Sequence, residues 1–124
     1  MNQVGATGDG LLLDRIRVFI MQRLSDRGLT PRAIAAAHHI SVRTLYRHFR
    51  VDGGASVAAW VRDRRLERCR RDLLDPRQRT RSVRAIALRW GFRNHAHFSR
   101  AFRAAYGTSP QRCRKHTPSV VDQR

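Results

Sequence analysis

Residues 82–110 read SVRAIALRWGFRNHAHFSRAFRAAYGTSP, and an earlier part of the chain repeats the pattern of this segment. Residues 84–87, Arg-Ala-Ile-Ala, repeat residues 32–35 at a shift of 52 positions. Residues 98–103, FSRAFR, match residues 45–50, LYRHFR, at a shift of 53. The shift changes by one residue between the two matches, so the connecting turns of the two copies differ in length by one residue. The chain therefore contains two copies of one helical unit.

Each copy carries the start signals of two helices. Thr30 before Pro31, and Ser82 in the later copy, are predicted to cap the first helix. Ser41 and Asn94 are predicted to cap the second. No segment alternates polar and apolar residues for long enough to be a strand. A capped helix, a tight turn and a second capped helix form a helix-turn-helix. We predict an all-α fold of about seven helices, with two such subdomains joined by a long linker helix.

Composition and capping also set the predicted domain boundaries. The small, Gly-rich start of the chain is typical of a mobile tail, and a Gly-Gly pair and an Asp-Pro pair flank the long helix. We predict disordered tails at 1–10 and 117–124, a first subdomain at 11–54, the linker helix at 55–76 and a second subdomain at 77–116.

One turn residue differs between the copies. Four positions after Ala87 stands Gly91, and four positions after Ala35 stands His39. Glycine suits such a turn because it adopts a left-handed backbone without steric cost. We expect His39 to adopt the same backbone at some energetic cost.

The charge of the chain points to a polyanionic partner. Lys and Arg number 26 against 9 Asp and Glu, a formal net charge of +17, and every basic residue except Lys115 is arginine. Arginine matches phosphate oxygens and guanine edges with a planar fork. No signal peptide and no membrane-spanning run is apparent, so we expect a cytoplasmic protein whose two cysteines stay reduced. Double-stranded DNA is the expected partner.

The second helix of each copy is predicted to enter the major groove of DNA, where arginine can bond both acceptors of guanine. The apolar residues Leu45 and Phe49, and likewise Phe98 and Phe102, should face inward. The exposed residues predicted to read bases are Arg43, Tyr46, Arg47 and Arg100, assisted by His95 and Ser99. The residues predicted to hold phosphates are Thr30, Ser41, Arg50, Ser82, Asn94 and Arg103.

The length of the linker helix predicts the spacing of these two helices. At about 1.5 Å per residue, residues 56–74 span roughly 28 Å. With the connector that follows, the separation becomes about 34 Å, which is one turn of B-DNA. One chain could thus place both helices in successive major grooves.

Three segments resemble the DNA-binding domain of the AraC/XylS-type transcription regulators. They are residues 85–92, 97–102 and 106–110, and residues 65–69 resemble the linker helix of that family. The resemblance covers about residues 11–115. It implies a homeodomain-like double helix-turn-helix and a bacterial transcription regulator. It also adds Ala96 to the base-reading positions, where it can pack only on a thymine methyl.

The same resemblance also implies which partners the chain has and in what state it binds DNA. RNA polymerase is a further candidate partner, and the chain would bind DNA as a monomer unless a separate domain is missing. Most members carry an effector-binding or dimerisation domain before this one. Whether the chain is complete, activates or represses, and answers to an effector stays open at this level.

Other functions fit the sequence less well. Asp63 and Glu67 stand among arginines and are better explained as helix-surface ion pairs than as a catalytic pair. The histidines lack metal-ligand spacing, so no enzyme activity, metal or cofactor is predicted. Cys69 is interpreted as a small core residue. The alternatives kept are a non-specific architectural or RNA-binding helical protein, whose binding would be salt-sensitive and sequence-independent, and, further behind, a basic amphipathic membrane binder.

Overall fold

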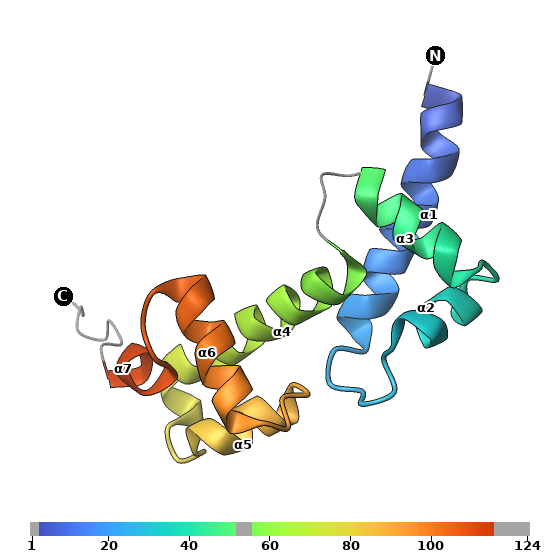
Figure 1. Cartoon of the computed structure of the whole chain (residues 1–124). Coiled ribbons are helices and arrows are strands. Elements are labelled where there is room, and N and C mark those ends of the chain that lie inside the picture. Colours follow the sequence, from blue (N-terminus) through green and yellow to red (C-terminus); the bar gives the residue numbers. More distant parts are fainter. Residues whose placement is uncertain (1–2, 52–55, 116–124) are drawn as a thin grey trace. The chain divides into compact units, whose positions relative to one another are not determined.

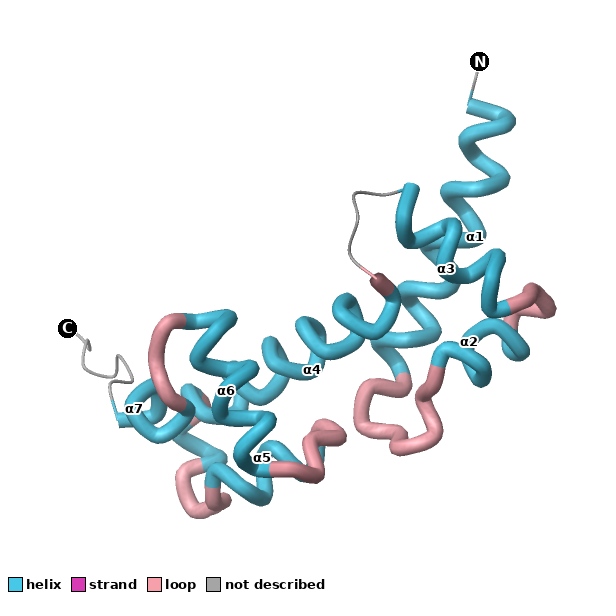
Figure 2. Tube along the Cα trace, in the orientation of Figure 1, coloured by secondary structure: helices cyan, strands magenta, loops and turns pink. Residues whose placement is uncertain are grey.

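The computed structural model describes residues 3–51 and 56–115, with the backbone alone at residues 3–9 and 51. This part of the chain forms helices joined by loops and contains no strand, so the all-α prediction is confirmed (Figures 1 and 2). The elements are α1 (Gln3–Gln22), α2 (Pro31–Ala37), α3 (Val42–Val51), α4 (Val57–Leu74), the 3₁₀ turn η1 (Pro76–Gln78), α5 (Val83–Arg89), α6 (His95–Tyr106) and α7 (Pro110–Lys115). None of the helices described here is both long and apolar enough to cross a membrane.

The first helix begins earlier than the predicted tail allows. It begins at Gln3, so residues 3–10, which were expected to be a disordered tail, are helical. A helix once formed extends at low cost, and no proline stands in this stretch to prevent it. The helix ends at Gln22, and a turn centred on Asp26 follows, in which the Asp26 carboxylate accepts a 2.8 Å hydrogen bond from the Gly28 N–H. The tail predicted at 117–124 and the Gly-Gly break at 53–54 lie outside the described residues.

The chain forms two compact units, residues 1–62 and 63–124. The division falls within α4, so the helix predicted to be a separate linker contributes its first turns to unit 1 and the remainder to unit 2. Ser56 caps this helix, since its hydroxyl accepts a 3.0 Å hydrogen bond from the Ala59 N–H.

Unit 1 packs α1, α2 and α3 around apolar side chains at helical spacing. The side chains of this core are at most 9% exposed. Burial of one leucine or isoleucine side chain contributes about 1.5–3 kcal/mol to the stability of the fold. The ring of Phe49 on α3 also meets Trp60 at the start of α4, edge to face, with ring centroids 6.0 Å apart. The buried set is Ile16, Ile20, Leu24, Leu29, Ile34, Ala35, Leu45, Phe49, Val57 and Val61.

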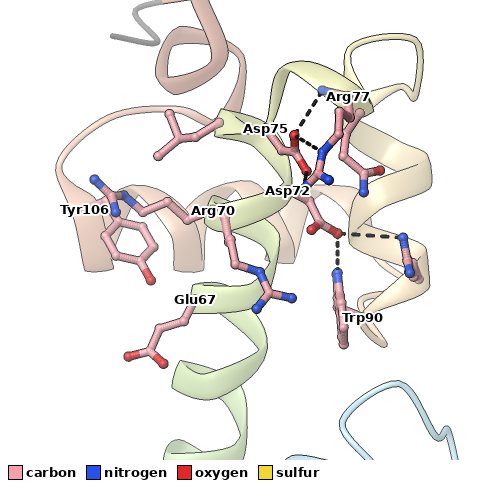
Figure 3. Close-up of a pocket in the computed structure, with 11 residues that line it drawn as sticks. Glu67, Arg70, Asp72, Asp75, Arg77, Trp90 and Tyr106 are labelled. Carbon is pink, nitrogen blue, oxygen red and sulfur yellow. Dashed lines mark hydrogen bonds and ion pairs between the residues drawn. The ribbon is translucent and has the colours of Figure 1, made fainter. Parts of the chain in front are cut away.

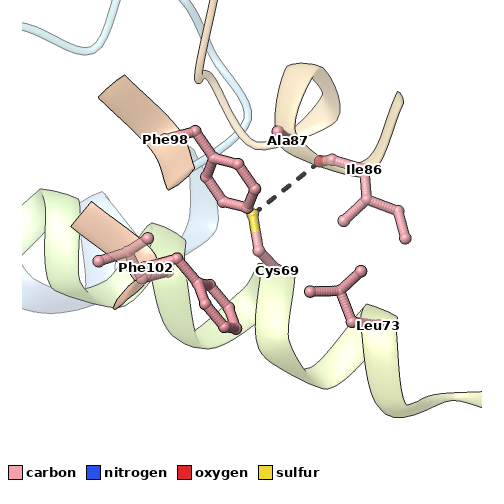
Figure 4. Packing of buried hydrophobic residues seen from close by; sticks show 7 residues of the cluster. Cys69, Leu73, Ile86, Ala87, Phe98 and Phe102 are labelled. Atoms are coloured by element: carbon pink, nitrogen blue, oxygen red, sulfur yellow. Dashed lines mark hydrogen bonds between the residues drawn. The ribbon is translucent and has the colours of Figure 1, made fainter. Parts of the chain in front are cut away.

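Unit 2 packs α5 and α6 onto the second part of α4 around one apolar cluster (Figure 4). Phe98 and Phe102 from α6 lie beside Cys69 from α4, and all three are fully buried. The interpretation of Cys69 as a small core residue is therefore confirmed. The whole cluster consists of Leu66, Cys69, Leu73, Ile86, Ala87, Phe98 and Phe102.

Candidate nucleic-acid interface

The turn between the first and second helix has the same geometry in both units. In unit 1 the N–H of Ile40 donates to the carbonyl of Ala35 at 3.1 Å, and the N–H of His39 donates to Ala36, also at 3.1 Å. In unit 2 the N–H of Phe92 donates to Ala87 at 2.9 Å. This is the Schellman arrangement, in which the residue after the helix cap has a left-handed backbone.

That left-handed residue is His39 in unit 1, with φ of 56°, and Gly91 in unit 2, with φ of 97°. Among the described residues, His39 alone has a positive φ without being glycine. The expectation that His39 adopts the glycine-like backbone is confirmed. Since a side chain is strained in this region, unit 1 reaches its turn at a cost that unit 2 avoids.

The helix that follows in unit 1, α3, presents its polar face to solvent. Ser41 caps it, because its hydroxyl accepts a 3.0 Å hydrogen bond from the Thr44 N–H. Leu45 and Phe49 are buried, as predicted from their spacing. The four residues on the opposite side are exposed, as expected, and they are Arg43, Tyr46, Arg47 and Arg50.

The corresponding helix of unit 2, α6, repeats this arrangement. The Asn94 side chain accepts a 2.9 Å hydrogen bond from the His97 N–H and so caps the helix. Phe98 and Phe102 are fully buried, and Gly107, with φ of 75°, ends the helix. Four of the predicted DNA-contacting residues are exposed and Ser99 is half-buried; the exposed ones are Asn94, Ala96, Arg100 and Arg103.

His95 does not face outward as expected. It is half-buried, its ring lies tilted against Phe98 with centroids 6.2 Å apart, and its Nδ1 is buried without a hydrogen-bond partner. The repeat explains this position, because a shift of 53 aligns His95 with Val42, which is also half-buried. The exposed histidine in the first turn of α6 is His97, which the sequence analysis did not select. The alignment of the copies was the signal that could have shown His95 to be a packing residue.

The residues predicted to cap helices do so, and their hydroxyl groups are oriented by that role. Thr30 accepts a 3.1 Å hydrogen bond from the Ala33 N–H, and Ser82 accepts one of 3.0 Å from the Ala85 N–H. Both caps are exposed and stand at the start of the first helix of their unit. Their contact with phosphate stays a prediction.

Unit 2 also holds a mixed-charge groove of about 850 Å³ that the sequence analysis missed (Figure 3). On one wall the buried carboxylate of Asp72 accepts a 2.8 Å hydrogen bond from the Trp90 indole. On another, Asp75 caps η1 and is held by hydrogen bonds from Arg77, which lower the pKa of the Asp75 carboxyl. Burial raises the pKa of the Tyr106 phenol, over whose ring Arg70 lies. The acidic groups of the groove are thus engaged internally.

The remaining reactive side chains have structural surroundings. Burial raises the pKa of the Cys69 thiol to about 12, so the nucleophilic thiolate is disfavoured there. Cys113 is half-buried, and desolvation raises its pKa as well. Glu67 forms a 3.1 Å ion pair with Arg64, in agreement with the helix-surface interpretation. Within residues 3–51 and 56–115 no group of three or more metal-ligating side chains comes together.

Comparison with known proteins adds family evidence to this geometry. A helix-turn-helix domain family matches residues 34–116, and a homeodomain-like domain family matches residues 11–53. The transcriptional activator NphR of Rhodococcus is 40% identical over 103 residues, which are 83% of this chain and 30% of that protein. The XylDLEGF operon transcriptional activator of Pseudomonas putida is 32% identical over 106 residues, 82% of this chain and 33% of that protein. The chain thus spans about a third of the length of these relatives.

Solved structures show the same fold. An AraC-type DNA-binding domain protein from Chromobacterium violaceum superposes with a TM-score of 0.79 at 24% identity, covering 90% of this chain and 96% of that one. The DNA-binding domain of AdpA, a global transcriptional factor solved in complex with a target DNA, superposes with a TM-score of 0.77 at 27% identity, covering 90% and 97%.

Proposed function

Because the chain belongs to the AraC/XylS family of helix-turn-helix transcription regulators, we propose that it binds specific DNA sequences and regulates transcription. One observation carries this proposal. Both units build the same turn and then present a helix with two buried apolar residues and exposed arginines at equivalent positions, Arg47 with Arg100 and Arg50 with Arg103. Such a helix fits the major groove of B-DNA.

In this proposal the centre of each exposed face reads bases. Arg47 and Arg100 would each bond the two acceptors of a guanine, because the guanidinium fork matches their spacing. Ala96 could only pack on a thymine methyl, which makes the first turn of α6 less selective than that of α3. His97 takes the exposed place expected of His95, which we assign to packing. The remaining base-reading candidates are Arg43, Tyr46 and Ser99.

The edges of the interface would hold phosphates. Arg50 and Arg103 are exposed one turn beyond the base-reading arginines. The caps Thr30, Ser41, Ser82 and Asn94 define where each helix begins, and phosphate contacts there would set the register of the protein without reading sequence. Such contacts would also make the affinity fall steeply with salt.

We further propose that one chain occupies two adjacent major grooves as a monomer, on the spacing expected from the length of the linker helix. A regulator of this kind would work in the cytoplasm and act on RNA polymerase after binding its site.

The test is a selection of bound sequences from a random duplex pool at near-physiological salt. Two short motifs with centres about 10–10.5 base pairs apart would support the two-groove proposal. One motif alone would restrict base reading to a single unit. Recovery of no motif, with binding still lost as salt rises, would contradict sequence-specific binding and favour a non-specific polyanion binder.

A further inference from the structure

In each unit one residue stands directly before the cap of the first helix of the helix-turn-helix. The two units hold this residue in different ways. In unit 1 this residue is Leu29, directly before the cap Thr30, and it is 9% exposed. The shift of 52 aligns Leu29 with Arg81, directly before the cap Ser82, and Arg81 is exposed. Unit 1 therefore anchors this point of the backbone by burying an apolar side chain, and unit 2 cannot do so.

In unit 2, Arg114 of α7 supplies the anchor instead. Its Nη1 donates a 2.6 Å hydrogen bond to the carbonyl of Arg81, and its Nη2 donates a 3.2 Å bond to the carbonyl of Gln78. The guanidinium is planar and rigid, so bonds from both of its terminal nitrogens fix the direction of the connector. The backbone at Arg81 is thus held without use of the Arg81 side chain, which is left pointing into solvent.

The surroundings of Arg81 are strongly cationic. Arg79 and Arg84, on either side of it in the sequence, are exposed as well. The carboxylate of Asp75, which begins the connector, is occupied by Arg77 through bonds of 3.2 and 3.3 Å. In unit 1 the exposed Arg27 and Arg32 stand at the positions of Arg79 and Arg84, but the buried Leu29 takes the place of Arg81, so the cation directly before the cap is specific to unit 2.

We propose that Arg81 is a phosphate contact present only in unit 2, and that Arg114 is the positioning residue that holds it. The inference rests on the proposed function. The first helix of a helix-turn-helix crosses the DNA backbone, so a cation at its start meets a strand rather than base edges. The contact would therefore add affinity and salt dependence but no sequence preference.

The first test compares the salt dependence of duplex binding for the wild-type whole chain and R81A. Loss of one phosphate contact lowers the slope of log K against log salt by about 0.9, so a fourfold rise in salt weakens R81A binding roughly 3.5-fold less than wild-type binding. The matched control is K115A, which removes one exposed charge from α7. A slope for R81A equal to that of K115A would overturn the proposal.

The second test separates positioning from direct contact at Arg114. We expect R114A and R114K to lower the slope equally, because lysine keeps the charge but cannot bond two carbonyls with a planar fork. The double variant R81A/R114A should show no further loss beyond R81A, since both changes remove the same contact. Retention of the wild-type slope by R114K, or additive losses in the double variant, would overturn the positioning role. Thermal unfolding of each variant checks that unit 2 stays folded, and R81A leaves the anchor intact.

The salt-dependence test of R81A gives a result whether or not the chain binds DNA sequence-specifically. If the wild-type chain binds all duplexes equally, the proposed regulator function fails, while the slope of R81A still tests the phosphate contact. If the wild-type chain selects a motif and R81A keeps the wild-type slope, the proposed function stands and this inference fails.

Discussion

Asp72 on α4 accepts a 2.8 Å hydrogen bond from the indole Nε1 of Trp90, the residue that caps the end of α5. The Asp72 side chain is buried, and the guanidinium groups of Arg68 and Arg89 lie over the Trp90 ring at 5.7 and 5.4 Å. This bond ties the helix-turn-helix of unit 2 to α4 directly before the turn at Gly91. The position of α6 in unit 2 depends on that turn.

We expect Trp90→Phe to lower the free energy of unfolding by about 1–3 kcal/mol, because it removes the 2.8 Å hydrogen bond to the buried Asp72 carboxylate and leaves that group the weaker ion pair with Arg89 at 3.9 Å. Urea denaturation followed by circular dichroism measures the change. Asp72→Asn is the matched variant and should lose less, since its amide oxygen still accepts the bond. A Trp90→Phe protein as stable as the wild type would show that this hydrogen bond contributes nothing.

His39→Gly should stabilise the chain by about 0.5–1 kcal/mol. It removes the strain of a side chain at φ of 56°, partly offset by the greater freedom of glycine in the unfolded chain. Gly91→Ala is the opposite test and should destabilise, because φ is 97° and a new Cβ would lie 3.0 Å from Cζ of Arg65. Thermal unfolding distinguishes the two. Destabilisation by His39→Gly would mean that the imidazole makes a compensating interaction.

Arg47→Ala and Arg100→Ala should each weaken binding to the selected duplex by about 1–3 kcal/mol and relax the preference at one base position. Arg50→Ala serves as the comparison, since a phosphate contact should weaken every duplex by the same factor. Dissociation constants on a panel of singly substituted duplexes measure both effects. An equal loss on all duplexes for Arg47→Ala would reassign that residue to the DNA backbone.

The buried thiol of Cys69 predicts a loss of stability at alkaline pH. Its pKa is about 12 in the folded chain against 9.0 for an ordinary thiol, so the unfolded chain releases the proton first. Stability should therefore be unaffected below about pH 9 and should fall as pH rises from there towards 12, by up to about 1.4 kcal/mol per pH unit.

The Cys69→Ala variant isolates this effect, because the other titrating groups are the same in both proteins. Its free energy of unfolding should fall less steeply between pH 9 and 11 than that of the wild type. Thiol labelling at pH 8 gives an independent check, with Cys113 expected to react before the fully buried Cys69. Parallel pH curves for the two proteins would contradict the raised pKa.

Local sequence patterns were enough to predict the helix caps and the buried faces of the helices, although not the start of α1. Ser82, Asn94, Phe98 and Phe102 act as predicted because capping and helical periodicity are local properties that neighbouring residues settle. The repeat also carried the geometry of both turns, including the unusual backbone of His39. The same alignment pairs His95 with the apolar Val42, which indicates that His95 is a packing residue.

The contacts between residues far apart in the sequence depend on how the helices pack. Asp72 and Trp90 are 18 positions apart, and Arg114 reaches carbonyls 33 and 36 positions earlier. No local pattern marks such partners, because an exposed arginine and an arginine that anchors a backbone look the same in a chain with this many of them. Their roles appear when α7 packs beside the connector and α5 packs on α4, since burial and the need of backbone carbonyls for donors then select which side chains meet.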